Sequence, residues 1–251
     1  MLTVTEVSRS FGGVYAVRDV SLSVADGEVC GVIGPNGAGK STLFNLITGH
    51  LPAEHGQISF RGRRVDRLPP HRRARLGMSI VFQAARVFHG MTVKENVMVG
   101  AHGRTRAGFV AAALRLPRHR SDEKEIDTEA TAALARVGLA KWADRPADRL
   151  PIGQQRALQL ARALCARPRL LLLDEPASGL RGQERERLAT LVEELRADGL
   201  TILLIEHDVA FVTRLADRIV VLDLGRVIAD GPPAEVRTDP LVLAAYLGPS
   251  A

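Results

Sequence analysis

The stretch GPNGAGKST, residues 34–42, decides the fold. It has the spacing G-x-x-x-x-G-K-[ST], and it lies between an apolar run, EVCGVI (28–33), and a helical segment (40–48) that Gly49 closes. The three glycines of the stretch let backbone amides approach oxygen atoms closely, and the following helix presents its N-terminus to the same place. The sequence therefore predicts a strand, a phosphate-binding loop and a helix in that order.

The side chains of this loop have separate expected roles. Lys40 reaches the β- and γ-phosphates of a nucleotide, Ser41 ligates Mg²⁺, and Thr42 lies toward the α-phosphate. We expect the whole loop to contact the nucleotide, namely Gly34, Pro35, Asn36, Gly37, Ala38, Gly39, Lys40, Ser41 and Thr42. The alternative is an ordinary glycine-rich turn before a helix, and the combination of strand, spacing and helix argues against it.

Further apolar runs extend this α/β pattern. LLLLDE (170–175) and TILLIE (201–206) have the length and composition of strands buried on both faces of a parallel sheet. Helical segments are predicted at 154–166 and 182–198. A second group of runs, rich in β-branched residues and separated by glycines, predicts an antiparallel β portion at 2–7, 15–24 and 57–60.

Helical patterns replace the strand signal between about 87 and 159. Ser121 is expected to open one helix of this region, and Gly138 to end it. The basic stretch 104–120 is most simply a solvated loop, with a partner contact as the alternative. The region predicts a helical subdomain (87–159) inserted into an α/β core formed by 1–86 and 160–251.

Composition limits the class of protein. The chain has 251 residues, 46% of them hydrophobic and 25% charged, which is enough for one large globular domain. No apolar run approaches the roughly 18–20 residues that span a bilayer, and the N-terminus lacks the layout of a secretory signal, so we expect a cytoplasmic protein. Cys30 and Cys165 look like small core residues.

The net charge of +6 suits a nucleic acid, a membrane surface or a phosphorylated ligand. Aromatic residues make up only 4% of the chain, which counts against a base-stacking platform. We therefore expect no nucleic-acid partner.

Four polar residues follow predicted core strands. Asp174, at the end of LLLLDE, is placed to hold Mg²⁺, and Glu175 can accept a proton from an attacking water. Gln83 follows SIVF and His207 follows TILLIE, so both are expected at the edge of the sheet where open parallel sheets place ligands. Gln83 can bond to Mg²⁺ or to the lytic water, and His207 to the γ-phosphate or to Glu175. We assign Glu175, His207 and Gln83 to catalysis, and Ser41, Gln83 and Asp174 to the metal.

With these motifs in this order, the sequence resembles the nucleotide-binding subunit of an ATP-binding cassette transporter over nearly its whole length. The resemblance implies a RecA-like core with an antiparallel β subdomain and a helical subdomain, and ATP with Mg²⁺ as cofactors. It makes residues 34–42 the Walker A loop, LLLLDE the Walker B strand, Gln83 the Q-loop residue and His207 the switch histidine. Phe11 matches the aromatic residue that stacks on adenine, although an ordinary edge-strand phenylalanine is the alternative.

The stretch LPIGQQR (150–156) falls where such proteins carry the signature L-S-G-G-Q. In the family, the signature of one subunit closes on the γ-phosphate held by the Walker A loop of another. Gly153 and Gln154 remain here, so backbone amides and the helix end can still bind phosphate. Pro151 and Ile152 replace the serine and first glycine, and Arg181 replaces an aspartate farther along. Taken alone, the stretch would simply be a helix start with Pro151 outside the helix and Gly153 at its cap.

These departures, together with the C-terminus GPPAEVRTDPLVLAAYLG, are similar to the LivG-like ATPase subunit of branched-chain amino acid importers. The resemblance implies two membrane permease subunits, a second copy or a paralogous ATPase, and an extracytoplasmic solute-binding protein. It places the chain at the cytoplasmic face of the cell membrane, with permease helices docking near Gln83 and 84–98. A soluble cassette ATPase of iron-sulfur assembly and an exporter ATPase are the alternatives.

Overall fold

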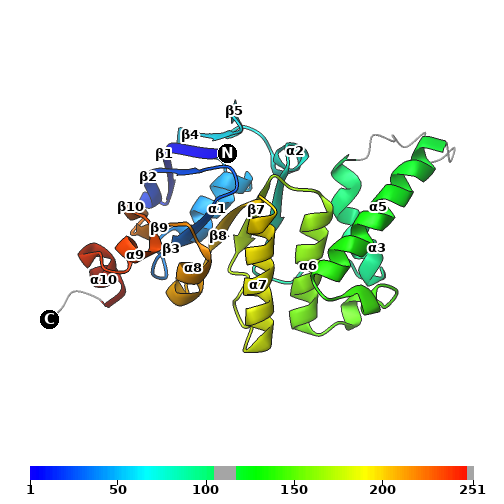
Figure 1. Cartoon of the computed structure of the whole chain (residues 1–251). Coiled ribbons are helices and arrows are strands. Elements are labelled where there is room, and N and C mark those ends of the chain that lie inside the picture. Colours follow the sequence, from blue (N-terminus) through cyan, green and yellow to red (C-terminus); the bar gives the residue numbers. More distant parts are fainter. Residues whose placement is uncertain (105–116, 248–251) are drawn as a thin grey trace. The chain divides into compact units, whose positions relative to one another are not determined.

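The computed structural model describes residues 1–104 and 117–247 (Figure 1). The chain divides into two compact units, Met1–Ile80 with Leu170–Ala251, and Val81–Arg169. The sequence predicts a helical subdomain at 87–159, whose bounds differ by six and ten residues from those of the second unit. The second unit includes the whole of one long helix, α6 (Ile152–Cys165). The unit therefore ends at Arg169, beyond the predicted end at residue 159.

A four-stranded antiparallel sheet occupies part of the first unit. Its order is β2–β1–β4–β5, with β1 at Leu2–Phe11, β2 at Val14–Val24, β4 at His55–Phe60 and β5 at Arg63–Arg64. Leu2, Val4 and Val7 on β1 are buried and pair across to β2, with register shifts after Val4 and Val7. The predicted antiparallel portion is confirmed, and its strands are longer than the β-branched runs that indicated them.

A six-stranded sheet forms the core of the first unit in the order β10–β9–β3–β8–β7–β6. Its strands are β3 (Val29–Ile33), β6 (Met78–Val81), β7 (Leu170–Asp174), β8 (Thr201–Ile205), β9 (Arg218–Asp223) and β10 (Arg226–Gly231). The strand β3 is parallel to both β8 and β9, and β7 is parallel to β8. In this register Val32 lies beside Ile205, and Ile205 beside Asp174, so the three strands end at the same edge.

The hairpin formed by β9 and β10 was not predicted from the sequence, although RIVVLD and RVIADG flank a two-residue Leu-Gly turn. Leu224 in this turn has φ 44°, a left-handed conformation that hairpin turns demand. The hairpin widens the sheet beyond the three apolar runs that predicted it.

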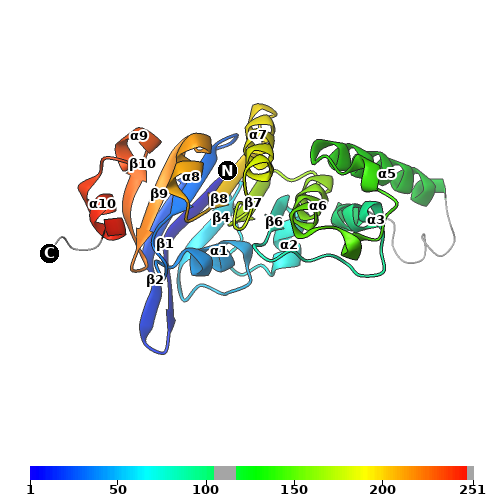
Figure 2. The ribbon, with the colours of Figure 1, turned by 90° about the horizontal axis from the view of Figure 1, so that it is seen from below.

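Helices cover the six-stranded sheet on both faces (Figure 1). The helix α1 (Lys40–Thr48) lies on the side of the antiparallel strands, and α7 (Gln183–Ala197) and α8 (Val209–Leu215) lie on the other side. Shorter helices complete the unit, namely α2 (Pro70–Arg75), α9 (Pro233–Val236) and α10 (Pro240–Leu247). As Figure 2 shows, α9 and α10 lie beside β10. The helix α1 and its closing Gly49 match the prediction to the residue.

The second unit is helical and has its own core. It contains α3 (Val93–Met98), η1 (Val99–Arg104), α5 (Pro117–Arg136), η2 (Ala140–Trp142), η3 (Ala147–Arg149) and α6. Buried side chains of α3, α5 and α6 pack together, including Val97, Leu134 and Leu158. A capping box between Thr92 and Glu95 fixes the start of α3.

Two expected helix starts in this unit were wrong. The helix α5 begins at Pro117, four residues before Ser121, because proline has the φ angle of a first helical position and no N–H to leave unpaired. The helix α6 begins at Ile152 with Pro151 as its N-cap residue, so Gly153 lies in the first turn instead of at the cap. Most of the basic stretch 104–120 lies outside the described residues.

Both cysteines are buried, as expected for core residues. Burial raises the pKa of the Cys30 thiol to about 12. In the part of the chain that the structure describes, no helix combines the length and apolar character that crossing a bilayer requires.

Candidate functional site

The loop 34–39 joins the buried strand β3 to the first turn of α1. Gly39 precedes the helix with φ 99°, and a Cβ atom there would come within 2.2 Å of the carbonyl oxygen of Ala16. A Cβ on Gly34 would come within 2.2 Å of the Leu222 carbonyl oxygen. These close approaches explain why both positions need glycine. No side chain caps the N-terminus of α1, so its first-turn amides point into the loop without a side-chain acceptor.

Lys40 is the cation of this loop. Its side chain is buried, and its Nζ donates to the carbonyl oxygens of Gly34 at 2.7 Å and Pro35 at 2.9 Å. Burial lowers the pKa of the ammonium, and the nearby carboxylates of Glu175 and Asp174 oppose that shift. Ser41 and Thr42 follow in the first turn of α1, with Ser41 exposed and Thr42 half-buried.

Asp174 ends β7 and faces the same cluster of charges. Its half-buried carboxyl has a pKa raised to about 6, mainly because burial disfavours the charged form. The carboxylates of Glu175 and Glu206 raise the pKa further, and Lys40 lowers it. A carboxylate with this environment gains from any cation that reaches it.

Glu175 follows with a left-handed backbone, φ 46°, which is rare for a residue with a side chain. Its N–H donates to the Ile205 carbonyl at 2.8 Å, and its own carbonyl accepts from Ser178 N–H at 3.1 Å. The Oε2 atom of Glu175 lies 3.7 Å from Nδ1 of His207. The structure therefore brings the predicted Lys40, Asp174, Glu175 and His207 together at one edge of the sheet.

Glu206 is a residue of this cluster that the sequence reasoning missed. Its side chain has no exposed surface, and its Oε2 lies 3.6 Å from Nδ1 of His207. Burial raises the pKa of its carboxyl, and hydrogen bonds from backbone N–H groups of Ala177 and His207 oppose that shift. The only signal was a charged residue at the end of an otherwise apolar strand.

Two aromatic residues of the first unit concern this site, namely Phe11, which the sequence predicts as a nucleotide contact, and Tyr246. Phe11 ends β1 with 47% of its surface exposed, and the guanidinium of Arg9 lies 5.1 Å from its ring centroid. Stacking of this ring on adenine stays a prediction. Tyr246 of α10 hydrogen-bonds to the Gly34 backbone, while burial raises the pKa of its hydroxyl to about 12. This contact joins the C-terminal helix to the phosphate-binding loop, and no sequence pattern indicated it.

The remaining predicted residues lie in the second unit. Gln83 follows β6 by two residues, and Gly153 and Gln154 lie half-buried in the first turn of α6. Residues of the same helix hold the chain after Gln83. Gln159 Nε2 donates to the Ala84 carbonyl at 2.8 Å, and an Arg162 Nη2 donates to the Arg86 carbonyl at 2.8 Å. Hydrogen bonds thus join the segment after Gln83 to α6.

Phe88 and Met91 belong to this segment and are exposed, by 44% and 37%. The fully buried Asn96 fixes the backbone beneath them, donating to the Phe88 and Thr92 carbonyls and accepting from Phe88 N–H. The guanidinium of Arg162 also lies 5.0 Å from the Phe88 ring centroid. An ordered segment with outward apolar side chains is suited to packing against another protein.

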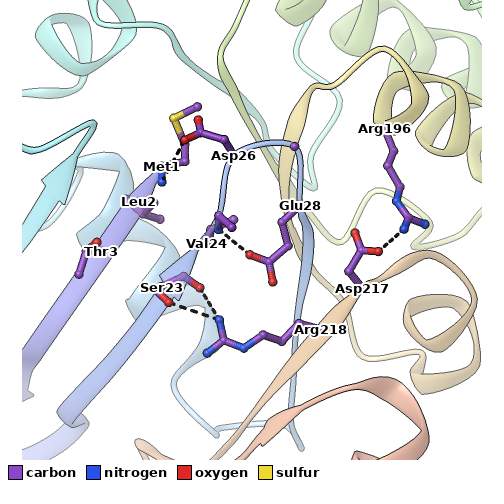
Figure 3. A pocket seen from close by; sticks show the side chains of 12 residues that line it. Met1, Leu2, Thr3, Ser23, Val24, Asp26, Glu28, Arg196, Asp217 and Arg218 are labelled. Atoms are coloured by element: carbon purple, nitrogen blue, oxygen red, sulfur yellow. Dashed lines mark hydrogen bonds and ion pairs between the residues drawn. The ribbon is translucent and has the colours of Figure 1, made fainter.

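A different hollow of about 650 Å³ lies at the opposite end of β3 from the phosphate-binding loop (Figure 3). It is lined by 1–3, 23–28, Arg196, Asp217 and Arg218. Its charged groups are paired with protein groups. Arg196 bonds to Asp217, Arg218 donates to the Ser23 carbonyl at 2.9 Å, and Met1 N lies 3.8 Å from Asp26 Oδ2. These pairs leave the hollow less suited to an anionic ligand than the loop at the other end of the strand.

The residues of the loop fit a Mg²⁺-nucleotide. Glycines leave room for close backbone approach, uncapped amides and Lys40 provide positive charge, and Asp174 and Ser41 provide the oxygen ligands that Mg²⁺ prefers. The donor set and the shape of the loop thus agree on a phosphate ligand with a hard cation.

Comparisons with known proteins agree with this chemistry. The sequence profile of the family described as ABC transporter matches residues 17–178, and that of the branched-chain amino acid ATP-binding cassette transporter matches 226–248. The chain is 42% identical over 99% of its length to the high-affinity branched-chain amino acid transport ATP-binding protein BraF of Pseudomonas aeruginosa, covering 98% of that protein. It is 41% identical, with the same coverage of both chains, to the corresponding protein LivG of Escherichia coli K12.

One solved structure is similar to this chain over nearly its whole length. The crystal structure of the ADP conformation of an ATP-binding cassette of an ABC transporter superposes with a TM-score of 0.85 at 32% identity, covering 99% of this chain and 98% of that one. The likeness extends over both units, and each of them therefore has a counterpart in a nucleotide-binding cassette.

Proposed function

The chain belongs to the ABC transporter family of ATP-binding cassettes, and from that premise we propose that it hydrolyses ATP to drive import of branched-chain amino acids or related small solutes. One observation carries the proposal, namely the meeting of the phosphate-binding loop, Asp174, Glu175 and His207 at one edge of the parallel sheet. The match of residues 226–248 to the branched-chain profile supports the solute class and favours import over export.

We assign each group a role in hydrolysis. Backbone amides of 34–39 and the Lys40 ammonium hold the β- and γ-phosphates, and Phe11 stacks on adenine. Glu175 accepts the proton of the attacking water, and His207, next to it, orients the γ-phosphate or the Glu175 carboxylate. Asp174 and Ser41 would hold Mg²⁺. The bound cation would neutralise charge that develops on the phosphates.

The proposal also includes partner proteins. Gly153 and Gln154 at the start of α6 contact the γ-phosphate held by a second ATPase subunit, either another copy or a paralogue. Two membrane permease subunits dock on the segment 84–98, whose exposed Phe88 and Met91 support this choice. An extracytoplasmic solute-binding protein delivers the solute, and the ATPase lies peripherally at the cytoplasmic face.

The test uses the transporter assembled with its permease subunits. Lys40→Ala should weaken ATP binding, because it removes the cation of the loop. Glu175→Gln should keep ATP binding and slow hydrolysis by at least about a hundredfold, as expected for loss of a general base. Both variants should abolish uptake of radiolabelled leucine, isoleucine and valine in vesicles.

Purification provides a second criterion. Permease subunits should be recovered with the tagged chain, whereas recovery of a soluble iron-sulfur scaffold would contradict the proposed function. Wild-type hydrolysis by the Glu175→Gln protein would refute the assigned base, and uptake that persists without hydrolysis would refute the coupling.

A further inference from the structure

Glu206 stands out among the described residues because its charged group is fully buried at the candidate site and has no role in the mechanism above. It directly follows β8, between Ile205 and His207. A carboxylate without contact to water is costly to fold unless hydrogen bonds compensate for the lost hydration. The groups that donate hydrogen bonds to the Glu206 carboxylate therefore indicate its role.

The two oxygens of Glu206 serve two different segments. Oε1 accepts a hydrogen bond from the N–H of Ala177 at 2.8 Å, in the turn that begins at Glu175. Oε2 accepts from the N–H of His207 at 3.2 Å and lies 3.6 Å from the Nδ1 atom of the same residue. One side chain thus bridges the turn after β7 and the loop after β8.

The backbone at this position adds a third connection. The N–H of Glu206 donates to the Val32 carbonyl at 3.2 Å, near the end of the strand that leads into the phosphate-binding loop. Glu175 N–H donates to Ile205, the residue before Glu206. The three segments that carry Lys40, Glu175 and His207 are therefore bonded to one another through the short stretch 205–207.

We propose that Glu206 is a positioning residue for ATP hydrolysis, whose buried carboxylate holds His207 and the turn after Glu175 in a single arrangement. The inference rests on the roles proposed above for Glu175 and His207. It adds a residue that touches neither the nucleotide nor the water and acts through those two side chains.

A carboxylate suits this task better than its neutral analogue. Both of its oxygens accept, and both segments present N–H donors to it. The amide of glutamine has a single acceptor oxygen, so one of the two N–H groups would face an NH₂ group instead. Glu206→Gln therefore removes one half of the bridge at almost unchanged volume.

The experiment measures kcat and KM for ATP in the assembled transporter carrying Glu206→Gln, His207→Ala or both. Glu206→Gln should leave KM within about twofold and lower kcat about tenfold, the effect of one charge-assisted hydrogen bond on a barrier. The double variant should be slower than His207→Ala by clearly less than the factor that Glu206→Gln costs alone, because the part of its effect that passes through His207 is already lost. If Glu206→Gln does not fold, Glu206→Asp, which keeps the charge and shortens its reach, replaces it under the same criteria.

Thr201→Val is the matched control. Thr201 is buried at the other end of the same strand, and its hydroxyl accepts from the Gly27 N–H at 2.8 Å. Its loss should lower the unfolding temperature and leave kcat unchanged, which separates a structural effect from a positioning effect.

The outcomes distinguish the two proposals. A wild-type kcat in Glu206→Gln, or effects of Glu206→Gln and His207→Ala that simply multiply, would overturn the inference while leaving the proposed function intact. A wild-type kcat in His207→Ala would instead refute the role given to His207 in the proposed function, and the inference would fall with it.

Discussion

The backbone of Glu175 is held in the left-handed region at φ 46°, which costs a residue with a side chain about 1 kcal/mol or more. Two backbone hydrogen bonds, to Ile205 and from Ser178, maintain this conformation. The turn directs the carboxylate toward His207 and Lys40 instead of along the strand. At this position the fold gives up stability for the placement of one functional group.

This strain predicts a difference between two substitutions. Glu175→Gln keeps a side chain and the strain, whereas Glu175→Gly removes both, so the glycine variant should be more stable by about 1 kcal/mol. Both should lose hydrolysis. Urea unfolding of the two nucleotide-free variants measures the difference, and equal stabilities would show that the backbone here is relaxed.

The raised pKa of Asp174 predicts a pH dependence of stability. Its folded-state value of about 6 lies above the usual 3.8, so between these values the folded protein binds the proton more tightly than the unfolded chain. The free energy of unfolding should therefore fall as pH rises through this window. Asp174→Asn removes the effect, so it should be more stable than wild type at pH 7, and the difference should shrink toward pH 4. Unfolding curves of both nucleotide-free proteins across this range test it, and a constant difference would contradict it.

At the scale of elements, α1 is stabilised at the end opposite to its phosphate-binding turn. The buried guanidinium of Arg73 donates to the Leu46 and Ile47 carbonyls at 2.7 and 2.6 Å, and to the Leu68 and Asp66 carbonyls at 2.8 and 3.0 Å. Burial lowers the pKa of this guanidinium to about 10, and Asp66 opposes the shift. A cation at a helix C-terminus interacts favourably with the helix dipole, and here its N–H groups bond to carbonyls of the last turn, of which Leu46 also accepts from Gly49 N–H.

Arg73→Leu should therefore lower the free energy of unfolding by about 3 kcal/mol, because several buried carbonyls lose their donor. Arg72→Leu is the control, since Arg72 is the exposed neighbour on the same helix and should change stability by less than about 0.5 kcal/mol. Denaturant unfolding of both variants decides the point. Similar losses in the two would show that the Arg73 bonds contribute nothing specific.

The helix α6 allows a test of the altered signature. An aspartate in the first turn favours a helix, so Gly153→Asp should fold, yet its charge should repel a γ-phosphate and abolish hydrolysis in the assembled transporter. Pro151→Ser restores at most one hydroxyl contact and should change turnover by no more than about tenfold. ATP affinity of the monomer should stay unchanged in both. If the Gly153→Asp protein hydrolyses ATP at the normal rate, residues 150–156 form only the start of a helix and do not contact phosphate.

At the scale of the whole molecule, the proposed site needs two subunits. We expect the Glu175→Gln chain to be largely monomeric alone and dimeric with ATP and Mg²⁺, because the phosphates complete both halves of the interface. Sedimentation velocity with and without nucleotide measures this. A dimer that forms equally without ATP would contradict the expectation, and a monomer under both conditions would point to a paralogous partner.

The sequence was most informative where function depends on neighbours along the chain. The spacing in GPNGAGKST predicted β3, the loop and α1 to within a residue, and the two carboxylates that end LLLLDE predicted the edge where they meet Lys40. Contacts between segments that are distant in the chain could not be predicted from a local sequence pattern. Glu206 bonds to Ala177 across 29 positions, and Tyr246 reaches the Gly34 backbone from the last helix. Those pairs are set by the order of strands in the sheet, which no local pattern contains.

The burial of Cys30 and Cys165 has a practical consequence for experiments on this chain. A thiol with a pKa of about 12 and no exposed surface, such as that of Cys30, is inert toward maleimides at neutral pH, because only accessible thiolate reacts at a useful rate. Cys165 is shielded within the helical core of its unit. A cysteine introduced at an exposed position outside the site, for example at Thr190 of α7, can therefore be labelled selectively in the native chain without first removing the natural thiols. A fluorophore or spin label attached there leaves the phosphate-binding loop unmodified, so ATP binding and hydrolysis can be measured on the labelled chain.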